Sequence, residues 1–175
     1  MKFPTRFHAE PGAFAEGYIA ASIAAMRSID LAQVAAAVHV VETMLERDGT
    51  LYACGNGGSA SISDHLVCDY VKAIRGDTTL ASRAHALTTN TALISAIAND
   101  LSYGDVFAYQ IESFARPGDV VMVVSSSGDS ENIVRAIDTA KKLGLDTIAL
   151  TGFDGGRARR IANVAIHVEL SLIHI

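Results

Sequence analysis

Short runs of β-branched and apolar residues alternate with helical stretches along most of this chain. The runs lie at residues 51–54, 84–87, 120–124, 147–150 and 164–168. Strands that are apolar throughout and separated by helices are typical of a parallel sheet with both faces covered. The sequence therefore predicts an α/β protein with a doubly wound five-stranded parallel sheet and helices on both faces.

Helical periodicity fills the segments before and between these runs. Two long helices are expected at the N-terminus, at residues 12–29 and 31–47, with Asp30 as the N-cap of the second. The other helices are expected at residues 60–75, 91–98, 106–115, 131–143 and 157–162. A chain of 175 residues has the length of a single domain, which we place at residues 1–169.

Two turns rich in glycine and serine each follow a predicted strand and precede a predicted helix. They read Gly55-Asn56-Gly57-Gly58-Ser59 and Ser125-Ser126-Ser127-Gly128-Asp129-Ser130. A helix N-terminus presents unpaired N–H groups, glycine lets the backbone approach an anion, and serine hydroxyls add donors. Either turn alone is also consistent with an ordinary serine-capped turn. Because ligands of open parallel sheets bind at the C-terminal ends of strands, the two together predict a phosphate-binding site.

Neither turn has the pattern of a nucleotide site. The P-loop sequence G-x-x-x-x-G-K-[ST], with its lysine, does not occur in them. The first turn also lacks the third glycine of the dinucleotide fingerprint. We therefore expect no nucleotide cofactor.

Charge and composition argue against several classes of partner. The net charge is −5 and the isoelectric point is near 5.6, so neither nucleic acid nor an anionic membrane is an expected partner. Arg157, Arg159 and Arg160 are few enough to form a solvated helix face. No apolar run reaches about 18 residues, so membrane insertion is not expected. Cys54 and Cys68 have no metal or redox spacing, and we interpret them as buried, reduced thiols of a cytoplasmic protein.

Four motifs in this order resemble those of the sugar isomerase (SIS) domain family, and within it the phosphoheptose isomerases. They are the two turns above, Ala98-Asn99-Asp100 between them, and Thr151-Gly152-Phe153-Asp154-Gly155-Gly156 after them. The resemblance extends from the predicted N-terminal helices to about His167. It implies the SIS fold, a pocket for a phosphorylated sugar and a homotetramer in the full-length form.

The resemblance also implies which residues bind the substrate. It places the phosphate on Ser125, Ser127 and Ser130, with Ser126 as a lesser candidate. The other substrate-binding residues that it implies are Asn56, Gly57, Gly58, Ser59, Asn99 and Asp100.

Asp129 replaces an asparagine that is common in the second turn of the family. A carboxylate beside a phosphate dianion repels it unless the carboxylate points away. We expect Asp129 to cap the helix that starts near Glu131, and contact with the ligand is the alternative.

The family's catalytic glutamate corresponds here to Asp69, and His65 lies one helical turn before it. Residues four apart lie on one face of a helix, so this pair is suited to acid/base chemistry. The pair also suits two ligands of a metal such as the zinc of some relatives. Aspartate is one methylene shorter than glutamate, and a displacement of about 1 Å can cost roughly a hundredfold in rate. A hydrogen-bonded pair without chemistry is the alternative.

The activity implied by the resemblance is the isomerisation of sedoheptulose 7-phosphate to glycero-manno-heptose 7-phosphate through an enediol. This aldose–ketose reaction supplies heptose for lipopolysaccharide or for a capsule or other surface glycan. A non-catalytic SIS module is the alternative function, either as a sensor of a sugar phosphate or as a binder of a protein such as a replication initiator.

The C-terminal end of the chain departs from the family. Relatives continue past the last strand into a helix with an acidic-x-x-His motif, whose histidine is the second acid/base. Residues 170–175 instead resemble the translation of a transposon mosaic-end adapter used in sequencing libraries. We expect them to be a foreign tail on a shortened reading frame, and we expect the chain without the second acid/base to be inactive.

Overall fold

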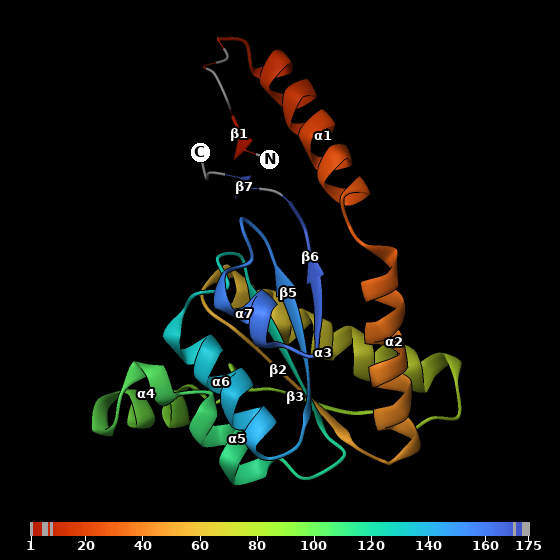
Figure 1. Ribbon diagram of the computed structural model, residues 1–175, viewed down its shortest axis with the longest axis vertical. Helices are drawn as coiled ribbons and strands as arrows, with labels where there is room; N and C mark the ends of the chain where they lie inside the picture. The colour runs from red at the N-terminus through yellow and green to blue at the C-terminus, as the bar shows by residue number, and fades with distance from the viewer. Residues whose placement is uncertain (1, 5–6, 8, 170, 173–175) are drawn as a thin grey trace.

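The computed structural model describes residues 2–4, 7, 9–169 and 171–172. Its centre is a parallel sheet of five strands with helices on both faces (Figure 1). The strands are β2 (Thr50–Gly55), β3 (Arg83–Ala86), β4 (Val120–Ser125), β5 (Asp146–Thr151) and β6 (Val164–His167). Each lies within about one residue of its expected bounds, so the predicted fold class is confirmed.

The winding of the chain reverses direction inside this sheet. The strands lie in the order β3-β2-β4-β5-β6, and all neighbours are parallel. The chain passes from β2 outward to β3, returns across β2 to β4, and continues in the opposite direction through β5 and β6. In doubly wound sheets, ligands bind at the carboxyl ends of the strands where the winding reverses. Here that point is between β2 and β4.

Two hydrophobic cores hold the helices against the sheet. One face is covered by α2 (Leu31–Glu46) and α3 (Gly58–Asp77). The other is covered by α4 (Thr91–Asp100), α5 (Ala108–Phe114), α6 (Glu131–Lys142) and α7 (Gly156–Ile161). Successive residues of a strand point to opposite faces. Accordingly, Val121 and Val123 of β4 belong to the core under α6, whereas Val120 and Met122 pack on the side of α2 and α3.

The first helix, α1 (Pro11–Arg27), projects away from the sheet (Figure 1). It has two buried residues, Ala21 and Ala25. Ile19, Ile23 and Met26 are exposed. The sheet therefore leaves an apolar surface of α1 uncovered.

The junction of α1 and α2 has the predicted cap. The carboxylate of Asp30 accepts a hydrogen bond of 2.9 Å from the N–H of Ala32, so the prediction for Asp30 is confirmed. Across the described residues, no single helix is long and apolar enough to cross a membrane. Only α1 and α2 taken together, with a 65° bend between them, meet the length and composition requirements.

Three short elements are not predicted by the sequence. A 3₁₀ turn, η1 (Tyr103–Asp105), follows α4, and β1 (Lys2–Phe3) pairs in parallel with β7 (Ser171–Leu172). Segments of two or three residues are too short to show a hydrophobic period. Of the expected foreign tail, residues 170 and 173–175 lie outside the described residues, and its origin stays a prediction.

The two cysteines have different environments. Cys54 of β2 is fully buried, and burial raises the pKa of its thiol to about 12. Cys68 of α3 is exposed, so the prediction that both thiols are buried is wrong for Cys68. Leu66 and Tyr70 pack toward the sheet, and Cys68, two residues from each, lies on the opposite side of α3.

We expect an aromatic disulfide reagent, followed by the absorbance of the thiolate that it releases, to modify one thiol per folded chain at about pH 8, and two after denaturation. Cys68→Ser should abolish the reaction of the folded chain, and Cys54→Ser should leave it intact. The raised pKa of Cys54 also lowers the free energy of unfolding as pH rises from about 9, where the unfolded thiol ionises, toward about 12. Modification of two thiols in the folded chain would contradict the burial of Cys54.

Candidate functional site

The two predicted turns lie side by side at the reversal between β2 and β4. β2 ends at Gly55 and α3 begins at Gly58, whereas β4 ends at Ser125 and α6 begins at Glu131. In the sheet, Gly55 is paired with Val124, one residue before the end of β4. The topology therefore brings the N-termini of α3 and α6 to one edge of the sheet.

A reciprocal amide pair connects the turns. Nδ2 of Asn56 donates to Oδ1 of Asn132, and Nδ2 of Asn132 donates to Oδ1 of Asn56, both at 2.8 Å. The hydroxyl of Tyr103 in η1 donates to the same Oδ1 of Asn56 at 3.0 Å. The side chain of Asn56, predicted to bind substrate, is thus committed to protein partners. Asn132 and Tyr103 are not among the predicted site residues. For Asn132, a polar amide among the apolar positions of α6 could have indicated a role in the site.

Both helix N-termini present free backbone donors toward this edge. The N–H groups of Gly57 and Gly58 donate to no described residue, and the same is true of Glu131 and Asn132 at the start of α6. Such groups bind anions well because they carry the positive end of the helix dipole.

The serine hydroxyls add further donors. Oγ of Ser125 accepts from the N–H of Gly128 at 3.1 Å, and Oγ of Ser127 accepts from the N–H of Asp129 at 3.4 Å. Each hydroxyl therefore keeps its own proton for a ligand. Ser130 is the N-cap residue of α6, but its side chain makes no capping hydrogen bond, so its hydroxyl is also free of that role.

A hollow of about 290 Å³ opens beside the two turns. Its lining includes Ser59 of the first turn, Ser126 of the second and Gly152 of the turn after β5. One predicted site residue of each turn, Ser59 and Ser126, thus borders this space, whereas Ser125, Ser127 and Ser130 are not among its lining residues.

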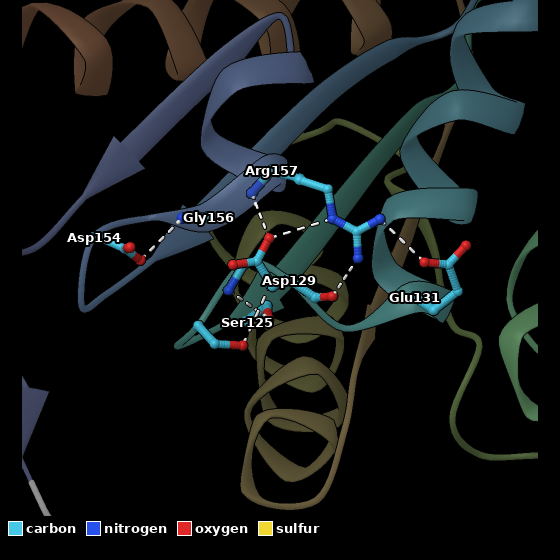
Figure 2. A network of polar contacts seen from close by, with 8 residues as sticks. Ser125, Asp129, Glu131, Asp154, Gly156 and Arg157 are labelled. Carbon is cyan, nitrogen blue, oxygen red and sulfur yellow. Dashed lines mark hydrogen bonds and ion pairs between the residues drawn. The ribbon is translucent and has the colours of Figure 1, made fainter.

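Asp129 does not cap α6, so that prediction is wrong. Figure 2 shows its carboxylate turned toward the start of α7, where Oδ1 accepts from the backbone N–H of Arg157 at 2.9 Å and from Nε at 3.3 Å. Nη2 of Arg157 donates to the backbone oxygen of Asp129 at 2.6 Å, and Nη1 donates to Glu131 at 3.0 Å. The hydrogen bond from the N–H of Arg157, followed by that from its side chain, lowers the pKa of Asp129. Arg157 is therefore part of a charge network, although its side chain is also 42% exposed, as its prediction as a solvated residue requires.

The second turn is also packed against the turn that begins α7. Gly128 has φ of +68°, and a Cβ there would lie 2.0 Å from the backbone oxygen of Gly155. A Cβ on Gly156 would lie 2.4 Å from the backbone oxygen of Ser127. The N–H of Ala158 donates to the oxygen of Gly128 at 2.9 Å. These close approaches require glycine, and they fix the serine turn from the side of α7.

The proposed acid/base pair lies apart from this hollow. Nε2 of His65 is 3.2 Å from Oδ2 of Asp69, and the two side chains are 76% and 65% exposed on the outward side of α3. Neither residue lines the 290 Å³ hollow. Within the described part of the chain, no group of three or more His, Cys, Asp or Glu side chains is arranged to hold a metal ion. His65 and Asp69 alone fall short of the three protein ligands of a catalytic zinc site.

The predicted residues Asn99 and Asp100 end α4 and bond to each other, with Nδ2 of Asn99 2.7 Å from Oδ1 of Asp100. Both are exposed, and among the described residues neither side chain bonds to the two turns. The segment reaches the site through η1 instead, where Tyr103 bonds Asn56.

Another hollow, of about 460 Å³, is lined by residues of β2, β3, α4 and α5. Tyr52 and His85 stack within it, with ring centroids 6.0 Å apart. None of the predicted site residues lines it, so size alone does not identify the phosphate site.

A doubly wound five-stranded parallel sheet, with two turns of glycine and serine at the reversal of its winding, defines the class of this protein as an open α/β fold. The SIS domain family matches residues 16–152 of the chain. A probable phosphoheptose isomerase of Thermoplasma volcanium is 40% identical over 158 residues, which cover 90% of this chain and 80% of that protein. The chain belongs to the SIS domain family and is a phosphoheptose isomerase-like enzyme.

Solved structures agree with this assignment. The phosphoheptose isomerase of Neisseria gonorrhoeae superposes with a TM-score of 0.77 at 35% identity, covering 89% of this chain and 82% of that one. The enzyme from Francisella tularensis gives a TM-score of 0.80 at 31% identity, with 90% and 83% covered.

The amide pair between the turns makes a testable contribution to stability. Asn132 is 2% exposed, so Asn132→Ala leaves the amide of Asn56 without its buried partner and should lower the free energy of unfolding by roughly 1–3 kcal/mol. In a double-mutant cycle followed by urea denaturation, Asn56→Ala and Asn132→Ala should be coupled by about 1 kcal/mol. Additive effects would show that the pair does not connect the turns energetically.

Proposed function

We propose that this protein, in its full-length form, isomerises sedoheptulose 7-phosphate to glycero-manno-heptose 7-phosphate. The observation that carries the proposal is the convergence of two helix N-termini and a serine turn at the reversal of the sheet, in a chain 40% identical to a probable phosphoheptose isomerase. A sensor or adaptor role has less support, because solved structures less than 25% identical to this chain share only its fold. The isomerase assignment is therefore preferred.

In this proposal the phosphate occupies the serine turn. The N–H groups at the starts of α3 and α6 and the hydroxyls of Ser125, Ser127 and Ser130 would donate to its oxygens, with Ser59 and Ser126 at the rim. Hydrogen bonds to an ionised acceptor are about twice as strong as neutral ones. The phosphate would therefore anchor the substrate and orient its carbon chain.

The placement of Asp69 favours a long substrate over a short one. Ten residues separate Ser59 from Asp69, which corresponds to about 15 Å along α3. A seven-carbon chain with its phosphate at the far end suits this separation better than a three-carbon sugar. The phosphate would thus lie near the start of α3, and the reacting carbons near its middle.

The proposed reaction starts from the open-chain ketose. The carboxylate of Asp69 removes a proton from C1, the electron pair forms the C1=C2 double bond, and the C2 oxygen gains a proton to give the enediol. Return of a proton to C2, with loss of the proton on the C1 oxygen, gives the aldose. His65, 3.2 Å from Asp69, orients the carboxylate and exchanges protons with it. Zinc on this pair stays a prediction, and no step depends on it.

We propose that the product enters a surface glycan, such as lipopolysaccharide, and that the enzyme acts in the cytoplasm as a homotetramer. The exposed apolar residues of α1 support the assembly, because Met26 and Ile19 are 61% and 57% exposed. Light scattering measures the mass, and a monomer at micromolar concentration would exclude the tetramer.

Removal of one serine hydroxyl that donates to the phosphate should weaken substrate binding without unfolding the chain. We expect Ser127→Ala to raise the dissociation constant for sedoheptulose 7-phosphate by roughly 10–100-fold in calorimetry, since a hydrogen bond to a charged group contributes about 1.5–3 kcal/mol. Ser95→Ala is the matched control, because its hydroxyl bonds within α4. Equal affinities of both variants and the wild type would exclude the serine turn as the phosphate site.

Asp69 is tested by a partial reaction. We expect the wild type in deuterated water to exchange the C1 hydrogen of sedoheptulose 7-phosphate, followed by NMR, and Asp69→Asn to lose at least about a hundredfold of that rate. Binding by Asp69→Asn should persist, since the phosphate is held elsewhere. An unchanged exchange rate would exclude Asp69 as the base.

A further inference from the structure

The second turn contains a carboxylate, that of Asp129, next to the place where the phosphate dianion of the proposed ligand would bind. Asp129 lies between Ser127 and Ser130 in the sequence, and two of its neighbours along the turn offer donors to the phosphate. An unpaired carboxylate here would repel that ligand. The contacts of Asp129 show how this chain resolves the conflict.

We propose that Arg157 is a positioning residue of the phosphate site, which pairs with Asp129 to turn its carboxylate away from the serine turn and to cancel its charge. The proposal rests on the proposed function, since it concerns the same site. In this proposal α7 affects ligand binding indirectly, through Asp129, and not by contact with the ligand.

The geometry supports a clamp rather than a single ion pair. Arg157 contacts Asp129 at both the side chain and the backbone, through its own N–H and Nε to Oδ1 and through Nη2 to the carbonyl oxygen. Nη1 reaches Glu131 at 3.0 Å. The guanidinium therefore bonds the residues before and after Ser130, and it fixes the position of that serine between them.

The local charge balance supports an electrostatic role as well. Arg135 bonds Glu131 at 3.1 Å and Asp105 at 2.7 Å, so three carboxylates share two guanidinium groups around the start of α6. Among the described residues, Asp129 has an ion pair with Arg157 alone. Without Arg157, the site would gain one uncompensated negative charge next to the phosphate.

The pair is not expected to act mainly through global stability. The side chains of Arg157 and Asp129 are 42% and 52% exposed, and exposed ion pairs typically add little to folding. Its effect should appear in ligand binding, where a nearby charge acts directly on a dianion. Arg157 itself already donates to three oxygen atoms of the protein, which distinguishes it from a side chain that is held ready for the ligand.

A double-mutant cycle that neutralises each charge tests the proposal. Four chains are compared by calorimetry with sedoheptulose 7-phosphate, namely the wild type, Arg157→Gln, Asp129→Asn and the double variant. We expect Arg157→Gln to weaken binding by about 10–30-fold, because it uncovers the Asp129 carboxylate. Asp129→Asn should bind as tightly as the wild type or a few times more tightly. The double variant should return to within about threefold of the wild type, because no carboxylate remains to be neutralised.

Three further measurements exclude a general structural effect. Arg157→Lys, which keeps the charge, should recover most of the affinity lost in Arg157→Gln. Arg159, an exposed residue of the same helix, is not among the groups that lower the pKa of Asp129, so Arg159→Gln is the matched control and should change affinity by less than about threefold. In the exchange assay, Arg157→Gln should raise KM and leave kcat within about twofold, since it does not touch the proposed base.

A double variant as weak as Arg157→Gln would overturn the proposal, because Arg157 would then act on the phosphate directly or through the fold. Equal affinity of Arg157→Gln and the wild type would overturn it as well. No binding by the wild type would overturn this proposal together with the proposed function, so the two failures are distinguishable.

Discussion

The reversal of winding between β2 and β4 is the constraint on which the rest of the site depends. Parallel strands direct their carboxyl ends to one edge, and the reversal leaves the helices after β2 and β4 on opposite faces of the sheet. Their N-termini are neighbours only at this point. The pair of half-buried Asn56 and buried Asn132 joins them, since each amide provides the other with both a donor and an acceptor. Such a pair tolerates little displacement, because an unpaired buried amide is costly.

The turn after β5 adds a second constraint to the same site. Gly128 and Gly156 allow the two backbones to approach more closely than any side chain permits. The N-terminus of α7 then lies beside the serine turn, where the N–H of Arg157 bonds Asp129. The amide pair thus joins the first turn to the start of α6, and α7 holds the serine turn through Asp129. A site bounded in this way is organised before the ligand arrives, which limits the entropy lost on binding.

The sequence predicts what periodicity and turn chemistry determine. The strands, the helix order and the pairing of the two turns follow from apolar runs and from glycine and serine at strand ends. The role of Asp129 does not follow, because a local rule favours the cap of the next helix, whereas the side chain bonds a helix 28 residues later in the chain. The same holds for Asn132, whose partner is 76 residues away, and for Arg157, which looks like one of several surface arginines. Contacts of this range depend on the packing of whole elements, which no local pattern contains.

The exposure of Cys68 and of the pair His65 and Asp69 has one cause. α3 packs on the sheet through residues such as Leu66 and Tyr70, so positions between them turn outward. The helix therefore presents an anion site at its N-terminus and a carboxylate on its solvent side. An exposed carboxylate is fully hydrated, and proton abstraction from carbon is more favourable once that water is displaced. In the proposed reaction the bound sugar itself covers this side of α3, so the phosphate anchor would supply the binding energy that desolvates Asp69.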